Sequence, residues 1–156
     1  MNQHTDPSLI ARRQWAMGLA ARASEAELAG PLQAHWPDHG ARDLKPVEAG
    51  LVMLRGRTGG DGAAFNLGEA SVSRAVVELP TGERGFGHVL GRNPAKARLA
   101  AVADALWQRQ ETRERIEAVL LAPIAARLAA EKARHQTETA ATRVDFFTMV
   151  RGEDAK

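Results

Sequence analysis

Two arginine-containing stretches carry the residue types that hold anions such as phosphate. In the first, Arg55 and Arg57 are followed directly by the glycine-rich stretch 58–62. Glycines let backbone N–H groups converge on an anion, and an arginine can hold the oxygens of that anion in bidentate fashion. The spacing matches neither the P-loop nor the dinucleotide-binding glycine pattern. A hairpin turn explains these glycines without a ligand, so we favour the turn and keep Arg55 and Arg57 as candidate phosphate contacts.

Arg92 is the third candidate, because it stands just before a predicted helix N-terminus. Asn93 suits the N-cap position, and Pro94 suits the first helical position, where its missing N–H costs nothing. The free amides and the helix dipole favour anions at such an end. The simpler interpretation, which we favour, is a capped helix with Arg92 in solvent.

No catalytic or metal-binding set emerges from the remaining polar residues. His35 and His39 have the spacing of a metal pair on a helix, but Pro37 and Gly40 interrupt that helix. The chain has no cysteine, and no Ser–His–acid arrangement stands out. We therefore expect no catalytic residue and no metal ligand in this chain, and assign it no cofactor of its own.

The C-terminal stretch 141–156 is apolar at its centre and charged at its rims. Aromatic and methionine side chains flanked by arginine are typical of anchors that are buried on a partner protein. The candidate interface residues are Arg143, Asp145, Phe146, Phe147, Met149 and Arg151. The alternative is that this stretch returns as a last strand on the protein's own sheet.

The elements that position these residues predict an α+β fold: N-terminal helices, a small antiparallel β meander, then C-terminal helices and an extended tail. Apolar spacing predicts a helix over 8–23. Ser24 and Glu27 have the form of a capping box that opens a second helix, through His35. Glycine-bounded apolar runs predict strands at 50–57, 65–67, 75–79 and 84–90.

The second half of the chain is predicted to be helical. One helix follows Asn93, with Leu99 and Val102 on its apolar face. Pro123 falls within the next apolar series, so we expect a kink or a new helix there. We expect the final helix to fray after Gln136.

Length and charge narrow the functional class. The 156 residues fit a single domain, 1–156, with 1–8 disordered and 141–156 as the tail. The formal charge is only +2, and acidic and basic residues alternate, which argues against nucleic-acid binding. No apolar run approaches the roughly 20 residues that span a bilayer. We expect a cytoplasmic protein with no membrane contact.

Several segments resemble the PhnG family, the G subunits of the bacterial carbon–phosphorus lyase system. The C-terminal motif 142–152 is the most specific. The stretches 47–52 and 57–60, Gly91-Arg92, and Arg13 with its two following residues are also similar. The resemblance covers roughly residues 11–153.

The resemblance implies an accessory role in a multi-subunit transferase of organic phosphonate catabolism. With the H, I and L subunits, a G subunit is required to transfer the ribose triphosphate of ATP to a phosphonate with release of adenine. ATP would be a co-substrate of the complex, and the partners would be the H, I, J and L subunits, most closely I. A purely structural scaffold and a direct phosphate- or nucleotide-binding subunit are the alternatives.

Overall fold

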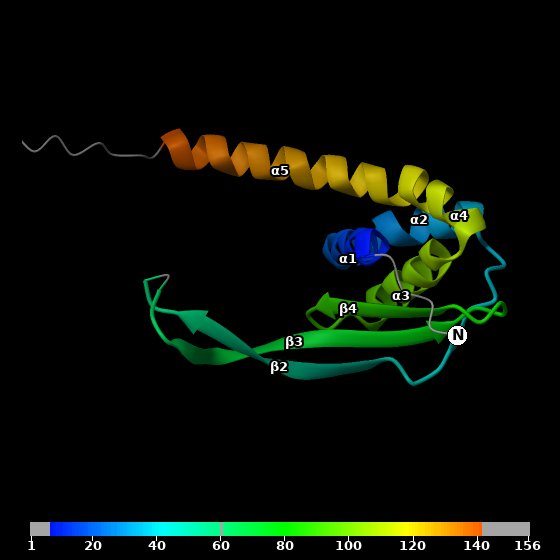
Figure 1. The fold of residues 1–156 in the computed structure, drawn as a ribbon, viewed down its shortest axis with the longest axis horizontal. Coiled ribbons are helices and arrows are strands. Elements are labelled where there is room, and N and C mark those ends of the chain that lie inside the picture. The colour runs from blue at the N-terminus through cyan, green and yellow to red at the C-terminus, as the bar shows by residue number, and fades with distance from the viewer. Residues whose placement is uncertain (1–6, 60, 142–156) are drawn as a thin grey trace, which may run out of the picture. The chain divides into compact units, whose positions relative to one another are not determined.

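The computed structural model describes residues 7–59 and 61–141, and it confirms the expected α+β class (Figure 1). By internal contacts the chain divides into two compact units, Met1–Ala125 and Ala126–Lys156, each described here by itself. Every core residue among those described belongs to the first unit. None of the described helices is long and apolar enough to cross a membrane.

The predicted helices and strands of the first unit occur in the predicted order, and a two-residue strand at 42–43 was not predicted. They are α1 (Pro7–Arg22), α2 (Glu25–His35), β1 (Arg42–Asp43), β2 (Glu48–Arg57), β3 (Ala64–Glu78), β4 (Arg84–Leu90), α3 (Pro94–Gln108), α4 (Gln110–Ile116) and a π-helical turn (Glu117–Leu121). Helix α5 (Ala122–Ala141) begins in the first unit and continues through the described part of the second.

Local side-chain chemistry sets the helix starts. The predicted capping box is confirmed: Glu27 N donates to Ser24 Oγ at 3.2 Å, and Ser24 N donates to the Glu27 carboxylate at 2.7 Å. The predicted start of α3 is also confirmed, since Lys96 N donates to the side chain of Asn93. Helix α1 begins at Pro7, so the last two residues of the stretch expected to be disordered are helical, while 1–6 lie outside the described residues.

The antiparallel meander is confirmed, with one correction. The runs 65–67 and 75–79, expected as two strands, belong to the single 15-residue strand β3, except for Leu79, which follows its end. This strand pairs with β2 over 64–74 and with β4 over 72–78. Because the two ladders overlap at 72–74, β3 is continuous between the two predicted runs. β1 pairs with β3 at Val77 and Glu78, where β4 also pairs, so β1 and β2 share one edge of β3 and β4 takes the other.

Helix α3 covers one face of the sheet because two glycines of β4 allow close contact (Figure 1). A Cβ atom at Gly85 would lie 1.9 Å from Ala101 O, and one at Gly87 would lie 1.9 Å from Ala97 O. The core lies between this helix and the strands, and continues to α1, α2 and the π-helical turn. Its largest fully buried side chains include Trp107, Leu28, Leu106, Ile116, Leu120, Leu121, Ile124, Val77 and Val89.

Residues 51–59 and 61–71, which we call the arm, form the part of the β2–β3 hairpin that extends beyond β4 (Figure 1). Within the described residues, the arm has only two strands, so the outer edge of β2 and the edge of β3 over 64–70 carry no further strand. A register shift between Leu54 and Arg55 interrupts its ladder. The arm is therefore a narrow ribbon without a layer of its own to cover it.

The region of Pro123 contains a π-helical turn rather than a break. Ala122 N donates to Glu117 O, five residues back, and α5 continues through Pro123. A wider turn accommodates a proline because it relieves the clash with the carbonyl four residues earlier.

Helix α5 runs to Ala141, so the expected fraying after Gln136 is wrong. Thr137 and Thr139 each donate to the backbone carbonyl four residues back, and Arg134 pairs with Glu138 at 3.9 Å, which supports the last turns. Ala141, the first residue of the expected tail, is helical. The rest of the tail, 142–156, lies outside the described residues, and so do all six candidate interface residues.

Candidate functional site

Arg55 and Arg57 lie near the end of the arm, and the glycine-rich stretch forms the turn between its strands. Arg57 donates to Gly62 O at 3.1 Å, and Gly62 N donates to Thr58 O at 3.1 Å. The hairpin-turn interpretation is therefore confirmed. The Gly62 amide, which could have donated to an anion, donates to a carbonyl of the turn instead. Arg55 and Arg57 point to the same face of β2, because they are two residues apart on a strand.

Arg92 does not join these two arginines. It follows Gly91, whose N–H donates to Ser71 O at 2.7 Å at the base of the arm. Arg55 pairs with Asn66, five residues farther along β3, which corresponds to about 16 Å. The three candidate phosphate contacts thus occupy two separate places, with Arg55 and Arg57 near the end of the arm and Arg92 at its base.

The loop that carries Arg92 is fixed by a buried serine. Ser73 is fully buried; its hydroxyl donates to Gly91 O at 2.9 Å and accepts from Asn93 N at 2.8 Å. The Asn93 side chain also donates to Glu25 of α2 at 2.9 Å. Arg92 itself is exposed and makes no hydrogen bond or ion pair with a described residue, so the capped-helix interpretation accounts for its position.

A buried ion pair joins α1, β4 and α3. Arg13 donates two hydrogen bonds to Asp104, at 2.9 and 2.8 Å, and the Asp104 side chain is only 2% exposed. The second Asp104 oxygen also accepts from Phe86 N at 2.9 Å, which satisfies an amide on the outer edge of β4. The hydrogen bond to Asp104 raises the pKa of Arg13 against the opposing effect of burial. Both carboxylate oxygens are occupied, so Asp104 is placed to hold elements together rather than to accept a substrate proton.

Next to this ion pair is an open cavity of about 460 Å³ with a largely apolar lining. It is lined by Leu9, Ile10, Arg13, Gln14, Met17, Phe86, Trp107, Gln108 and Arg113. Its two cations are already engaged: Arg13 by Asp104, and Arg113 by the carbonyls of Trp107 and Gln108, each at 3.0 Å. The Arg113 guanidinium also lies 4.8 Å from the Trp107 ring centroid. This cavity suits an apolar or aromatic group better than an anion.

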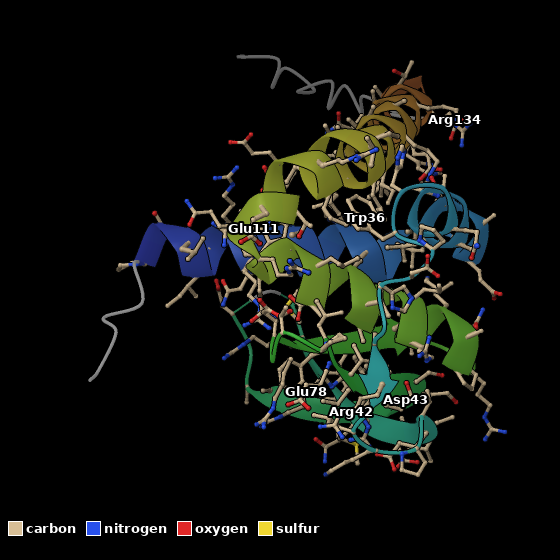
Figure 2. The ribbon with its side chains drawn as sticks, turned by 90° about the vertical axis from the view of Figure 1, so that its right-hand side faces the viewer. Trp36, Arg42, Asp43, Glu78, Glu111 and Arg134 are labelled. Carbon is tan, nitrogen blue, oxygen red and sulfur yellow. The ribbon has the colours of Figure 1, made fainter. Side chains whose placement is uncertain are left out.

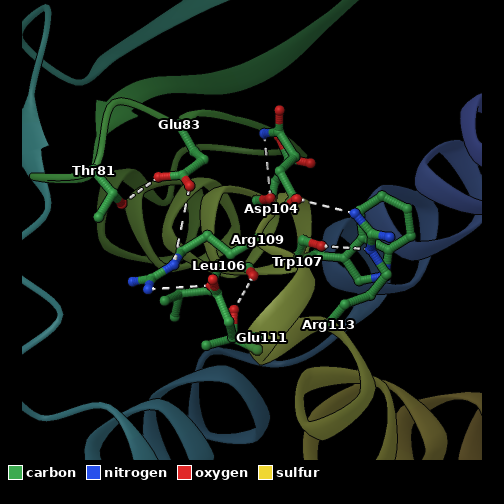
Figure 3. A network of polar contacts seen from close by, with 10 residues as sticks. Thr81, Glu83, Asp104, Leu106, Trp107, Arg109, Glu111 and Arg113 are labelled. Atoms are coloured by element: carbon green, nitrogen blue, oxygen red, sulfur yellow. Dashed lines mark hydrogen bonds and ion pairs between the residues drawn. The ribbon is translucent and has the colours of Figure 1, made fainter. Parts of the chain in front are cut away.

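A polar network surrounds the C-terminal end of α3 (Figure 3). Arg109 lies between Glu83 and Glu111, and Thr81 donates to the Glu83 carboxylate. Glu117 accepts from Trp107 Nε1 at 2.8 Å and pairs with Arg12. Burial opposes ionisation of Glu117, but the hydrogen bonds from Arg12 and Trp107 outweigh it and lower the pKa. The network fixes the junction of α3, α4 and the sheet.

His35 and His39, the two histidines with the spacing of a metal-binding pair, make local structural contacts instead. His35 ends α2 and contacts Arg115, whereas His39 Nδ1 accepts from Ala41 N at 2.9 Å in the following turn. Among the described residues, no group of three or more histidine, aspartate and glutamate side chains is arranged to hold a metal ion.

Comparison with known proteins places this architecture in a family. Residues 11–152 match the profile of the family described as "Phosphonate metabolism protein PhnG". The chain belongs to the PhnG family. It is similar to a protein of Rhizobium meliloti (strain 1021) named "Alpha-D-ribose 1-methylphosphonate 5-triphosphate synthase subunit PhnG", with 52% identity over 150 residues that cover 96% of each chain.

The PhnG match includes residues whose importance the sequence alone did not reveal. The resemblance included Arg13, but nothing local showed that this residue pairs with Asp104 across 91 positions. One usable signal was an aspartate among the apolar positions of α3, between Ala103 and Ala105, since a charged side chain there needs a partner. The long exposed arm had no such signal.

Proposed function

We propose that this chain is a subunit of the α-D-ribose 1-methylphosphonate 5-triphosphate synthase complex in phosphonate metabolism. The observation that carries the proposal is the 52% identity, over 96% of both chains, to a protein with that name. A match of this extent leaves no room for a different architecture in either chain.

We further propose that the chain is an accessory subunit that acts with the H, I and L subunits. In the reaction, a phosphonate oxygen bonds to the anomeric carbon of ATP, the bond from that carbon to adenine breaks, and adenine leaves with a proton. The described residues support an accessory role, because the buried carboxylate Asp104 is already held by Arg13 and Phe86 N.

Co-purification tests the subunit proposal directly. A tagged chain is co-expressed with the H, I and J subunits, and the mass of the product is determined. We expect one stable complex that contains all four proteins; a lone monomer would refute subunit membership. Release of adenine from ATP and methylphosphonate by the isolated chain would refute the accessory role.

Direct binding of phosphate by Arg55 and Arg57 is the second candidate. Its specific support is that both arginines are exposed and that neither forms an ion pair with a described residue, so both guanidinium groups are available to an anion. Arg55→Ala is the cleaner test, because Arg57 also closes the hairpin turn. If the arginines bind ATP, this variant weakens binding of an ATP analogue to the assembled complex about tenfold; unchanged binding would exclude the role.

A scaffold role in which the C-terminal stretch anchors a neighbouring subunit, most closely the I subunit, remains part of the proposal. Its support is compositional: Phe146, Phe147 and Met149 lie between Arg143 and Arg151. If this role holds, deletion of Asp145–Lys156 releases the neighbouring subunit.

A further inference from the structure

The arm exposes far more apolar surface than a free hairpin needs. Leu51 is 57% exposed, Met53 54%, Phe65 45% and Leu67 64%, and Val52 and Leu54 are exposed as well. An antiparallel sheet with one face in water normally alternates apolar and polar residues. Here four consecutive residues of β2, 51–54, are large, apolar and exposed, so both faces of the arm need a covering layer.

The register separates the two faces chemically. Val52, Leu54 and Phe65 share one face, and Leu67 joins them because a Cβ atom at Gly56 would lie 2.4 Å from Leu67 Cδ1. This face has no charged side chain along the arm. Gly56 therefore leaves space for a continuous apolar patch near the end of the hairpin.

The opposite face is apolar near the base, apart from Glu69 opposite Met53, and positive near the end. Leu51 and Met53 share it with Arg55 and Arg57, at intervals of two residues. Neither arginine is paired with Asp61 or Glu69, the acids of the arm, nor with any other described carboxylate. A surface that buries this face must therefore supply carboxylates beside the two arginines.

We propose that the arm inserts into a groove of another subunit of the complex, one that is largely apolar on both walls and lined with carboxylates at its deep end. The inference rests on the proposed subunit function. The N–H and C=O groups on the outer edge of β2 and along 64–70 of β3, which pair with no described strand, would also form main-chain hydrogen bonds with the partner. A second copy fits less well, since the same face of its arm carries two arginines, Arg55 and Arg57, against one carboxylate, Glu69.

The test measures the Kd of the tagged chain for the co-expressed partner subunits. Leu67→Glu places a charge in the apolar patch, and we expect at least about a 30-fold weaker Kd. Arg55→Glu reverses one charge at the end of the arm, and we expect at least about a tenfold loss. The matched controls are Leu90→Glu, on an exposed strand leucine outside the arm, and Arg92→Glu, on an exposed arginine outside it. Both should stay within about threefold of the wild-type chain.

The outcomes separate the two proposals. Wild-type assembly with unchanged binding by both arm variants would overturn the arm inference and leave the subunit function intact. Failure of the wild-type chain to assemble would overturn the subunit function and the inference with it. A wild-type dimer that Leu67→Glu converts to a monomer would identify a second copy as the occupant and overturn the inference.

Hydrogen exchange gives a readout that does not depend on variants. Amides of 51–57 and 64–71 should exchange at least about tenfold more slowly in the complex than in the free chain. Equal rates would overturn the inference. If deletion of Asp145–Lys156 speeds exchange of the same amides in the free chain, the chain's own tail covers the arm, which would also overturn it.

Discussion

At the scale of residues, the pair of Arg13 and Asp104 is the polar contact on which most of the first unit depends. The two residues come from α1 and α3, and the same carboxylate holds the edge amide of Phe86 in β4. A carboxylate that is 2% exposed is costly unless each oxygen is bonded, and here both are. One side chain thus sets the distance among three elements.

Asp104→Ala should lower the free energy of unfolding by about 2–4 kcal/mol. The substitution leaves a guanidinium and a buried edge amide without their acceptor, and the figure stays moderate because Arg13 is 31% exposed and water can reach it. Urea denaturation measures the loss. Glu111→Ala, which removes a 77% exposed partner of Arg109, should have no measurable effect. Equal stability of the two variants would contradict the role of the buried pair.

His39 should make the fold less stable as the pH falls below neutrality. Burial, and next the charge of Arg98, lower the pKa of His39 below its ordinary 6.5. The unfolded chain therefore binds more protons than the folded chain as the pH falls below 6.5, so stability is complete above that pH and declines below it. The neutral ring is also the form whose Nδ1 accepts from Ala41 N.

His39→Asn removes this titration and keeps a side-chain acceptor for the same amide two residues on. The urea midpoint of the wild-type chain should fall between pH 7.5 and pH 5.5 by more than that of the variant. Carboxylates whose pKa is lowered, such as Glu78 and Glu117, stabilise the fold above about pH 4.5 and lose this effect only as the pH falls below that value, which is outside this window. Parallel pH profiles of the two proteins would show that His39 is not responsible.

At the scale of elements, the contact between α3 and β4 depends on the absence of side chains at Gly85 and Gly87. Both positions face the helix backbone, and a Cβ atom at either would lie 1.9 Å from a carbonyl oxygen. Neither glycine has a positive φ, so the requirement is space and not backbone conformation. The alanine-rich surface of α3 is the complementary half of the same contact.

Gly87→Ala should destabilise the protein by at least about 3 kcal/mol, because the obstacle is backbone that must move as a unit. The matched control is Gly18→Ala in α1, where no atom lies within 4 Å of the added Cβ. That change should stabilise the fold by about 0.5–1 kcal/mol through helix propensity. Thermal unfolding of both variants measures the two changes in stability. A loss of less than about 1 kcal/mol for Gly87→Ala would contradict the prediction and mean that α3 can shift away from β4.

The sequence predicted those elements whose signals are local. The capping box of Ser24 and Glu27 and the Asn93-Pro94 start of α3 are complete within a few residues, and both are confirmed. The continuity of β3 depends on two partner strands distant in the sequence, and the length of α5 on a series of weak contacts, so both were mispredicted. The pairing of Arg13 with Asp104 was beyond reach for the same reason.

At the scale of the whole molecule, the most exposed apolar surface lies where the sequence predicted an ordinary strand of the meander. Alternation predicts which residues share a face, but it cannot show whether a second layer covers that face. In the first unit, α3 covers β3 and β4 (Figures 1 and 2), whereas the side chains of 51–54 remain exposed. The exposed arm and the apolar C-terminal stretch are independent reasons to expect assembly.

Deletion of Asp145–Lys156 should release the partner subunits and leave the remaining chain folded. The described core ends at Ile124, so the deletion removes no buried residue of the first unit. Co-purification reports the loss of partners, and circular dichroism with urea denaturation reports the intact fold. A truncated chain that still assembles with wild-type affinity would exclude the tail as an anchor.

The unpaired outer edge of β2 also bears on how the protein is produced. An uncovered, apolar strand edge adds to any extended chain it meets, including another copy of itself. Copies made in excess of their partners would therefore form insoluble aggregates or be degraded, and the usable amount would follow the scarcest partner. For a protein with this edge, balanced synthesis of the subunits becomes a requirement of its solubility.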